Sequence, residues 1–379
     1  MKKILIIAGE ASGDLHGSNL VKAMKEQDPS LVFYGVGSRN MREAGVSLLA
    51  DASEVSVVGA TEVVTHIGAI CRVYTKLKRF LREERPDLLI LIDFPDFNIL
   101  TGKVAKRLGI PILYYISPQV WAWRKGRVNT LAKLVTAIMV VFPFEVELYR
   151  DAGVDVRFVG HPLADVVSSV YTREGARAFL NIAPDSPTVA LLPGSRAKEI
   201  MHLLPDMLKA ASILRRRFPE IQFVLPVAHT LAPSLVEKYV ADSGIPIRIT
   251  DGQVYDVLRA SDAAIVTSGT ATLETGLMAV PMVIIYRISR LSYLIGRMFI
   301  HVKHIGLVNI VAGRTVVPEL IQDDVTPEKI ASAIETLLAD KNKHKQVENE
   351  LRQVRLQLGE GGASGRAASV ARELIERAA

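Results

Sequence analysis

The chain of 379 residues is poor in cysteine and has no long apolar run. Cys71 is its only cysteine, so no disulfide can form within the chain, and a reducing compartment is expected. No apolar stretch approaches the roughly 20 residues that a membrane-spanning helix needs. Glu10 interrupts the apolar residues that follow Met1, so this stretch predicts a buried first strand rather than a signal peptide. These absences favour a cytoplasmic protein that is soluble or meets a membrane from one side.

Charge and metal-ligand patterns narrow the classes of partner. Lys and Arg number 46 against 40 Asp and Glu, which gives a net charge of +6 and a pI near 9.3. Such a balance attracts nucleic acids, phosphorylated small molecules and acidic membrane surfaces alike. No RNA-binding signature is present, so nucleic acid is not expected. Of the eight histidines, only His301 and His304 have a ligand-like spacing, which is more typical of a solvated helix face, and neither a metal nor a cofactor is expected.

The length and the alternation of apolar runs predict a two-domain α/β protein. A single core rarely supports 379 residues, and strand-like runs alternate with helical patterns in both halves. The expected strands are 4–8, 32–36, 88–92, 112–116, 137–141 and 156–159, then 189–192, 222–227, 247–249, 263–266 and 282–286. This pattern is typical of two Rossmann-like domains whose parallel sheets face one another across a cleft.

The domain boundary is expected near residues 160–163. We predict a first domain over 1–164, a second over 165–345, and C-terminal helices over 346–379. The last helix, about 366–378, follows a glycine-rich break and is expected to pack back on the first domain.

The most informative segment is the apolar run 88–92, which is followed by Asp93 and Asp96. Five consecutive large apolar residues suit a strand buried on both faces of a parallel sheet, and ligands bind at the carboxyl edge of such sheets. Pro95 biases Phe94 away from helix and so fixes the direction in which Asp96 projects. An acid at this place is a candidate general base, and capping of the following helix is the alternative.

A glycine-containing turn follows the first expected strand. Gly9 and Gly13 let a ligand approach the backbone, and the start of the next helix offers unpaired N–H groups to an anion. The turn matches neither G-x-G-x-x-G nor a P-loop. Ser12 is explained equally well as a helix cap, whereas Glu10 should reach the same sheet edge as Asp96.

The second half has two comparable strand exits. The first holds Ser195 and Arg196, and the planar guanidinium of Arg196 suits phosphate oxygens. The second is a turn that leads into a helix carrying Glu274, an arrangement that can place a diphosphate on the helix N-terminus and a ribose diol on Glu274. The residues of that turn are Ser268, Gly269 and Thr270.

These segments together resemble the lipid-A-disaccharide synthase family over nearly the whole chain. The matching motifs lie at 9–14, 93–98, 117–124, 142–145, 160–162, 192–196, 268–271 with Glu274, and 309–314. The tryptophan-containing motif and Pro-Asp-Phe-Asn are the specific ones. The resemblance implies an inverting glycosyltransferase of the GT-B type. Such an enzyme transfers 2,3-diacylglucosamine from its UDP derivative to the 6-hydroxyl of 2,3-diacylglucosamine 1-phosphate, and forms a β-1,6-linked disaccharide 1-phosphate and UDP.

The resemblance also implies that the first domain binds the lipid acceptor and the second binds the UDP-sugar. We expect Asp96 to remove the acceptor proton with Glu10 beside it, and Arg196 and the turn 268–270 to stabilise the departing diphosphate. The other substrate-binding candidates are Asn98, Arg287, Asn309, Glu319 and Gln322. For Glu319 and Gln322, a solvated helix surface is the alternative.

Because both implied substrates carry acyl chains, the chain is expected to bind an anionic membrane surface at the inner face of the cytoplasmic membrane. Segment 68–85 has an apolar stripe flanked by basic residues, which a core-facing helix would also show. Segment 291–300 and the tryptophans Trp121 and Trp123, which precede Arg124, Lys125 and Arg127, are further candidates. The sequence leaves open whether the chain forms a homodimer.

Two rival functions predict different assay results. A glycosyltransferase or epimerase of a soluble UDP-sugar would act without acyl chains. A non-catalytic basic protein that binds RNA or membranes would release no UDP, and it would leave Glu10 and Asp96 without a purpose.

Overall fold

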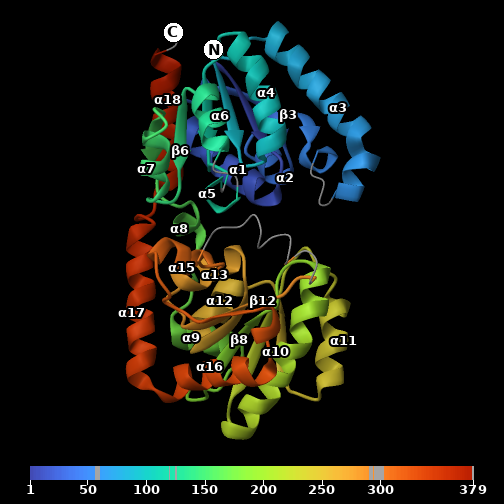
Figure 1. Cartoon of the computed structure of the whole chain (residues 1–379), viewed down its shortest axis with the longest axis vertical. Helices are drawn as coiled ribbons and strands as arrows, with labels where there is room; N and C mark the ends of the chain where they lie inside the picture. Colours follow the sequence, from blue (N-terminus) through green and yellow to red (C-terminus); the bar gives the residue numbers. More distant parts are fainter. Residues whose placement is uncertain (56–59, 119, 124–125, 290–292, 294–302, 378–379) are drawn as a thin grey trace. The chain divides into compact units, whose positions relative to one another are not determined.

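The computed structural model describes residues 1–55, 60–118, 120–123, 126–289, 293 and 303–377. The chain forms two compact units (Figure 1). Unit 1 contains Met1–Asp165 and Leu358–Ala379, and unit 2 contains Val166–Gln357.

Unit 1 is built on a seven-stranded parallel sheet with the order β3-β2-β1-β4-β5-β6-β7. The strands are β1 (Lys3–Ala8), β2 (Val32–Gly37), β3 (Val46–Asp51), β4 (Leu88–Ile92), β5 (Ile112–Tyr115), β6 (Ala137–Val140) and β7 (Asp155–Phe158). All five residues of β4 are buried, because β4 lies between β1 and β5 and is covered on both faces. The apolar run 88–92 therefore forms the central strand that its composition predicted.

Helices cover both faces of this sheet, as right-handed crossovers require. The helical segments of unit 1 are α1 (Ala11–Gln27), α2 (Arg39–Glu43), η1 (Ala52–Glu54), α3 (Ala60–Glu83), α4 (Pro95–Arg107), α5 (Val120–Trp123), α6 (Arg127–Leu134), α7 (Glu145–Arg150), α8 (Leu163–Val166, which ends in unit 2) and α18 (Ala363–Arg377). Helices α3, α4 and α6 pack on one face together with Leu5 and Leu89. On the other side, α18 packs along α1 and reaches β4, so the last helix belongs to unit 1 (Figure 1).

The carboxylate of Asp165, in α8 at the end of the first part of unit 1, holds the start of α18. It accepts hydrogen bonds from the backbone N–H groups of Gly362 (2.6 Å), Ala363 (3.3 Å) and Ser364 (3.3 Å). The part of the C-terminal region that belongs to unit 1 begins at Leu358, and α17, which precedes it, packs against α13 and α15 of unit 2.

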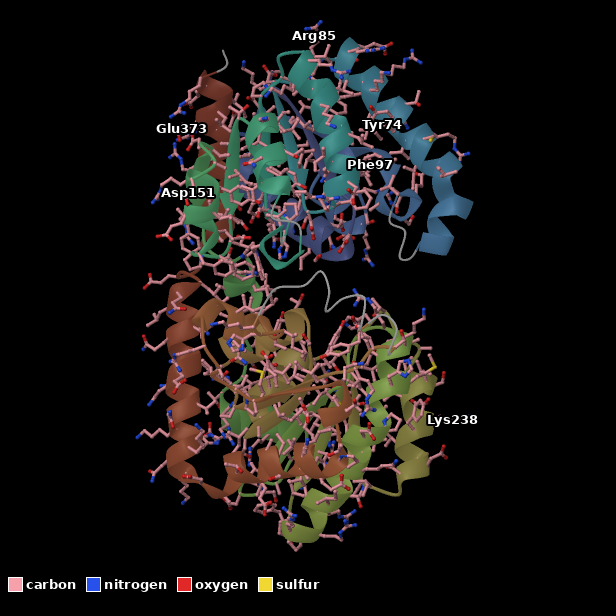
Figure 2. All side chains as sticks on the ribbon, viewed as in Figure 1. Tyr74, Arg85, Phe97, Asp151, Lys238 and Glu373 are labelled. Carbon is pink, nitrogen blue, oxygen red and sulfur yellow. The ribbon has the colours of Figure 1, made fainter. Side chains whose placement is uncertain are left out.

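The apolar stripe of α3 faces the core. Val73, Leu77 and Leu81 are buried, and Tyr74 meets Phe97 of α4 edge to face with ring centroids 6.4 Å apart (Figure 2). Of the two interpretations of segment 68–85, the core-facing helix is the one observed. Its basic residues remain on the outer side of α3.

Unit 2 repeats the architecture with a six-stranded parallel sheet of order β10-β9-β8-β11-β12-β13. The strands are β8 (Thr188–Leu192), β9 (Gln222–Val227), β10 (Ile247–Asp251), β11 (Ala263–Thr267), β12 (Met282–Tyr286) and β13 (Glu319–Ile321). The helical segments are α9 (Arg173–Phe179), α10 (Ala197–Arg217), α11 (Pro233–Ser243), α12 (Val254–Ala260), α13 (Thr270–Leu277), α15 (Leu307–Ala312), η2 (Gln322–Asp324), α16 (Pro327–Ala339) and α17 (Lys341–Gln357).

Candidate active site

Two acidic residues meet at the carboxyl edge of the unit 1 sheet. Ala8 at the end of β1 pairs with Ile92 at the end of β4, which brings the following residues, Glu10 and Asp93, into electrostatic contact. Burial of Asp93, followed by the charge of Glu10, raises the pKa of the Asp93 carboxyl to about 6. Glu10 itself is exposed, at the N-cap position of α1.

The turn that carries Asp93 has a strained backbone, which side-chain hydrogen bonds stabilise. Asp93 and Phe94 have φ angles of 46° and 45°, in the left-handed region that non-glycine residues seldom adopt. The side-chain amide of Asn98 donates hydrogen bonds to the backbone carbonyls of Ile92 (3.1 Å) and Asp93 (2.7 Å), and the Tyr114 hydroxyl also donates to the Asp93 carbonyl. Asn98 is fully buried, so its observed role is to hold the turn, and a substrate contact remains a prediction.

Asp96 lies in the first turn of α4, where the helix dipole favours a negative charge. The N-cap position of α4 is occupied by Phe94. The Asp96 side chain is 78% exposed and forms an ion pair with Arg127, the first residue of α6, whose side chain is only 15% exposed. The pair fixes an accessible carboxylate at the same sheet edge as Glu10 and Asp93.

The turn after β1 places its small residues close to the backbone of the sheet. Gly13 is buried, and a Cβ there would lie 3.4 Å from the Ala8 side chain, whereas Ser12 is exposed. Asp14, one turn into α1, is buried, and its carboxylate accepts backbone hydrogen bonds from Ser38 and Asn40 (2.6 and 3.0 Å). Asp14 therefore supports the start of α2, whereas the exposed Glu10 and Ser12 are accessible to a ligand.

A buried carboxylate that belongs to the motif 142–145 but was not predicted as a site residue lies at the exits of β5 and β6. Glu145, the first residue of α7, accepts hydrogen bonds from Ser117 Oγ (3.2 Å), Trp121 Nε1 (3.1 Å) and the backbone N–H of Phe142 (3.2 Å). Burial raises the pKa of Glu145 to about 7 despite these donors. The local signal was the position of an acid directly after the apolar segment 142–144.

In unit 2, the exit of β8 forms a compact loop around Glu199. The Glu199 carboxylate accepts backbone hydrogen bonds from Ser195 (2.9 Å) and Arg196 (3.2 Å) and pairs with the Arg196 guanidinium (2.9 Å). Gly194 has φ +110°, and a Cβ there would lie 2.2 Å from Glu199 Oε2. The Arg196 side chain is 73% exposed, so it is accessible to an anion at the carboxyl edge of this sheet.

The exit of β11 leads into the N-terminus of α13, where the anion site was predicted. Gly269, with φ 149°, is the N-cap of α13, and Thr270 begins the helix with an exposed side chain. Ser268 Oγ donates to the carbonyl of Ile305 (3.0 Å). Glu274, one turn on, accepts a hydrogen bond from the Tyr255 hydroxyl (2.9 Å), and burial raises its pKa.

The remaining residues of unit 2 that were predicted to bind substrate form hydrogen bonds with the loops after β12 and β13. All four hydrogen bonds of the Asn309 amide stay within unit 2: it donates to the Val317 carbonyl and Glu319 and accepts from the Val316 and Val317 N–H groups. Glu319 also accepts from the N–H groups of Ile305 and Gly306. These residues therefore support the start of α15, and their contact with substrate remains a prediction.

Gln322 and Arg287 are likewise held by internal partners. The Gln322 amide bonds both the N–H and the carbonyl of Ile288 (2.8 and 3.0 Å), and Arg287 pairs with Asp206. Glu319 lies in strand β13, and Gln322 is buried in the 3-10 helix η2, so neither is a solvated residue of a helix surface.

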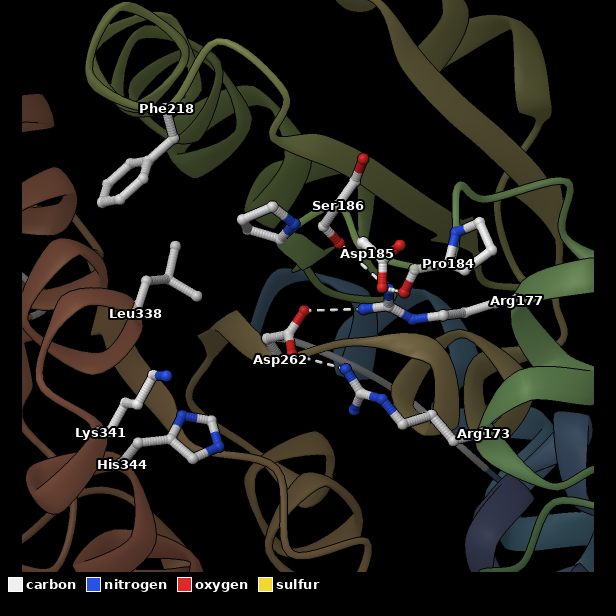
Figure 3. A pocket seen from close by; sticks show the side chains of 11 residues that line it. Arg173, Arg177, Pro184, Asp185, Ser186, Phe218, Asp262, Leu338, Lys341 and His344 are labelled. Atoms are coloured by element: carbon white, nitrogen blue, oxygen red, sulfur yellow. Dashed lines mark hydrogen bonds and ion pairs between the residues drawn. The ribbon is translucent and has the colours of Figure 1, made fainter.

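A pocket of about 350 Å³ opens at the other end of the unit 2 sheet, where β8 and β11 begin (Figure 3). Asp262 pairs there with Arg173 (2.5 Å) and Arg177 (2.8 Å). Arg177 also donates to the backbone carbonyls of Ala260 and Ser186. The charges of this pocket therefore serve the packing of α9, and the pocket lies away from the strand exits described above.

Several predicted features lie outside the described residues: segment 291–300 apart from Tyr293, His301, Gln119 of the tryptophan motif, and Arg124 and Lys125. Within the described ranges, no three His, Cys, Asp or Glu residues are grouped so that they could hold a metal ion. In the same ranges, none of the helices combines the length and the apolar character needed to cross a bilayer.

Solved structures with this architecture include nucleotide-sugar enzymes. The UDP-GlcNAc 2-epimerase from Neisseria meningitidis bound to UDP-GlcNAc matches with a TM-score of 0.66 and 11% identity, and covers 98% of this chain and all of that one. MurG from Acinetobacter baumannii matches with a TM-score of 0.61 and 14% identity over 98% of this chain and all of that one. These similarities show the two-domain GT-B fold.

Sequence relatives are much closer. The lipid-A-disaccharide synthase of Syntrophus aciditrophicus (strain SB) is 52% identical over 377 residues, which are 99% of this chain and 98% of that one. That of Myxococcus xanthus (strain DK1622) is 44% identical over 98% of this chain and 97% of that one. The family model for lipid-A-disaccharide synthetase matches residues 4–374. The chain therefore belongs to the lipid-A-disaccharide synthetase family of glycosyltransferases.

Proposed function

We propose that unit 1 binds 2,3-diacylglucosamine 1-phosphate and that Asp96 removes the proton from its 6-hydroxyl. The reaction is the lipid A disaccharide synthesis of the family, with UDP-2,3-diacylglucosamine as donor. The observation that carries the proposal is an accessible Asp96 carboxylate, held by Arg127 at the sheet edge where Glu10 and Asp93 also lie. General base catalysis of this kind contributes roughly 10²- to 10⁴-fold.

The chemical step forms one bond and breaks one. The acceptor oxygen attacks the anomeric carbon from the face opposite the diphosphate, its proton passes to Asp96, and the bond to the diphosphate oxygen breaks. UDP leaves with the electron pair, and the configuration inverts. Because the attack is in line, the base and the leaving-group site act on opposite faces of the transferred sugar.

Unit 2 supplies the groups suited to the donor. Arg196 and the N-terminus of α13 at Thr270 offer positive charge to the diphosphate, and Glu274 offers a carboxylate to the ribose hydroxyls. The fold is also one in which UDP compounds have been seen, as in the Staphylococcus aureus MnaA–UDP structure, with a TM-score of 0.69 and 14% identity. The remaining candidates around Asn309 would shape this site through the loops they hold.

The assay for this function measures UDP release. Enzyme is incubated with UDP-2,3-diacylglucosamine and 2,3-diacylglucosamine 1-phosphate, and each substrate is omitted in turn. The proposal requires UDP release only when both are present. Equal turnover of acyl-free sugars would favour the soluble-sugar transferase or epimerase instead.

We also propose that the outer face of α3 binds an anionic membrane surface. The apolar stripe is used by the core, but Arg72, Arg79 and Arg82 are exposed on the solvent side. Basic residues near an anionic bilayer contribute about 1 kcal/mol each. Binding to vesicles that contain an anionic lipid should fall when Arg72 and Arg82 are both changed to glutamate. The control variant changes Lys209 and Arg259 of unit 2, which are also exposed, to glutamate. An equal loss of vesicle binding in the two double variants would contradict a binding surface on α3.

A further inference from the structure

Glu145 joins two strand exits of unit 1 through a single buried carboxylate. The side chain is fully buried, and its three donors come from the loop after β5, from α5 and from the loop after β6. Tyr149, one turn further along α7, donates its hydroxyl proton to Ser117 Oγ (3.0 Å). A fully buried charge is unfavourable unless it is hydrogen-bonded, so removal of Glu145 would leave three donors without an acceptor.

Aromatic rings fix the same segment. Trp121 packs edge to face against Phe142 and Phe144, with centroids 6.5 and 5.2 Å apart, and those two rings are stacked on each other at 5.5 Å. His161 contacts the Phe142 ring at 5.2 Å. The position of Trp121 is therefore determined by one hydrogen bond and two ring contacts, all from the exit of β6 and the start of α7.

The helix that begins at Glu145 packs against the helix that carries the partner of the proposed base. Arg127 is the first residue of α6, which contacts both α7 and α4, the helix of Asp96. Arg127 is the better buried member of that pair. A displacement of the start of α7 would therefore move the guanidinium that orients the Asp96 carboxylate.

We infer that Glu145 is a positioning residue for the acceptor side of the active site: it holds Ser117 and Trp121 against the start of α7, and through the packing of α7 against α6 it sets the place of Arg127 and hence of Asp96. The inference rests on the proposed role of Asp96. It gives a function in the reaction to a buried acid that lies away from the reacting atoms. Small displacements of a positioned catalytic group can cost about 10²-fold in rate.

The chain offers a spectroscopic readout of this network. Its only two tryptophans, Trp121 and Trp123, both lie in α5, so intrinsic tryptophan fluorescence reports on this segment. The wild-type signal should titrate near pH 7, where the carboxyl that accepts the Trp121 proton changes its charge. The titratable neighbours of Glu145 do not interfere, since the pKa of Tyr149 is raised and that of His161 is lowered to about 3 by burial.

The test compares Glu145→Gln with Glu147→Gln, the same substitution at an exposed position of α7. Glu145→Gln should abolish the fluorescence titration and lower kcat about 10- to 100-fold, with the KM for the UDP-sugar unchanged. Glu147→Gln should match the wild type. If Glu145→Gln does not fold, Ser117→Ala removes one donor and leaves the carboxylate in place, and it should lower kcat in the same direction.

A second comparison separates positioning from a general structural effect. In an Arg127→Ala background, Glu145→Gln should lower kcat no further, because both substitutions act on the same carboxylate. The inference would be overturned if the two substitutions lowered kcat independently, so that their factors multiplied, or if Glu145→Gln alone had the wild-type kcat. Failure of the proposed function is a separate result: in that case Asp96→Ala itself would keep its turnover.

Discussion

The ring of Phe94 lies where a side chain on Gly9 would have to be, since a Cβ at Gly9 would be 2.4 Å from Cγ and 2.5 Å from Cδ1 of Phe94. The two residues follow neighbouring strands, β1 and β4, and each is adjacent in sequence to an acid of the candidate site, Glu10 or Asp93. Phe94 itself adopts a left-handed conformation with φ 45°. The close contact therefore couples the two strand exits that carry the acids.

Gly9→Ala should thus damage activity more than stability. The added methyl group has to displace the Phe94 ring, and overpacking of this kind typically destabilises by about 1–3 kcal/mol. Displacement of the 93–96 turn should lower kcat about 10-fold or more. Activity assays and thermal unfolding measure the two effects. Phe94→Ala in the same chain should restore part of the loss, so strictly additive effects of the two substitutions would contradict the coupling.

Asp96→Asn should lower kcat by about 10²- to 10⁴-fold, because the amide cannot accept the acceptor proton. UDP binding, followed by calorimetry, should be unchanged, since the groups proposed for UDP lie in unit 2. Asp151→Asn is the matched control, because Asp151 is an exposed acid of unit 1 beside α7 (Figure 2). An Asp96→Asn enzyme with near-normal turnover would exclude the residue as the base.

Asp93→Asn should be more stable than the wild type at pH 8. The pKa of Asp93 is raised from 3.8 to about 6 in the folded state, so the folded protein binds this proton more tightly than the unfolded chain does. Its contribution is therefore most favourable at low pH, and stability is lost as the pH rises from about 4 to 6. A shift of this size corresponds to about 3 kcal/mol.

Denaturant unfolding of wild type and Asp93→Asn at pH 4 and pH 8 measures this effect. The variant keeps an oxygen for the backbone N–H of Phe94, and asparagine tolerates the left-handed backbone that Asp93 adopts. The difference between the two proteins should therefore be small at pH 4 and favour the variant at pH 8. The opposite sign at pH 8 would show that the Asp93 charge is stabilised by its surroundings.

The sequence predicted the central strands well because buried strands consist of continuous apolar runs. It missed the edge strands β3 and β13; β3 has only two buried residues, Val46 and Ala50, and β13 has only three residues. Edge strands are covered on fewer sides, so they need no apolar run. The alternation of runs and breaks thus predicted the inner strands and the edge strands β7 and β10, but not the edge strands β3 and β13.

The candidate site could be predicted only where the chemistry is local. The positions of Glu10, Asp96 and Arg196 at strand exits could be predicted because each follows a buried strand within four residues, whereas their roles stay predictions. Glu145 was not found, because its role depends on Ser117 and Trp121, which are more than 20 residues away in sequence. Asn309 was predicted to bind substrate, but the partners of its amide, Val316, Val317 and Glu319, become apparent only in the folded structure.

Glu199→Gln should weaken binding of the UDP-sugar without changing the acceptor kinetics. The Glu199 carboxylate holds the N–H groups of Ser195 and Arg196 and orients the Arg196 guanidinium. An amide can replace only part of these bonds, so we expect the KM for the donor to rise by about 3- to 10-fold, equivalent to roughly 0.7–1.4 kcal/mol. Glu237→Gln on α11, an exposed position of the same unit, is the control. A larger change in acceptor KM than in donor KM would contradict the assignment of this loop.

His161→Asn should make the protein less sensitive to acid. Burial lowers the pKa of His161 from 6.5 to about 3, so the folded state holds the imidazole neutral, and stability is lost as the pH falls from about 6.5 towards 3. His161 Nδ1 accepts a hydrogen bond from the backbone N–H of Leu163 (3.1 Å), a bond that the Asn oxygen can replace without a titrating group. Asp93 and Glu145, whose raised pKa values act in the opposite direction, are common to both proteins, so the difference between the two isolates His161. Unfolding free energies measured at pH 7 and pH 4 should therefore fall by about 3 kcal/mol more in the wild type than in the variant. Equal losses would contradict the buried, neutral imidazole, and His16, whose pKa burial lowers to about 4 although the charge of Asp165 raises it, would be the next histidine to test.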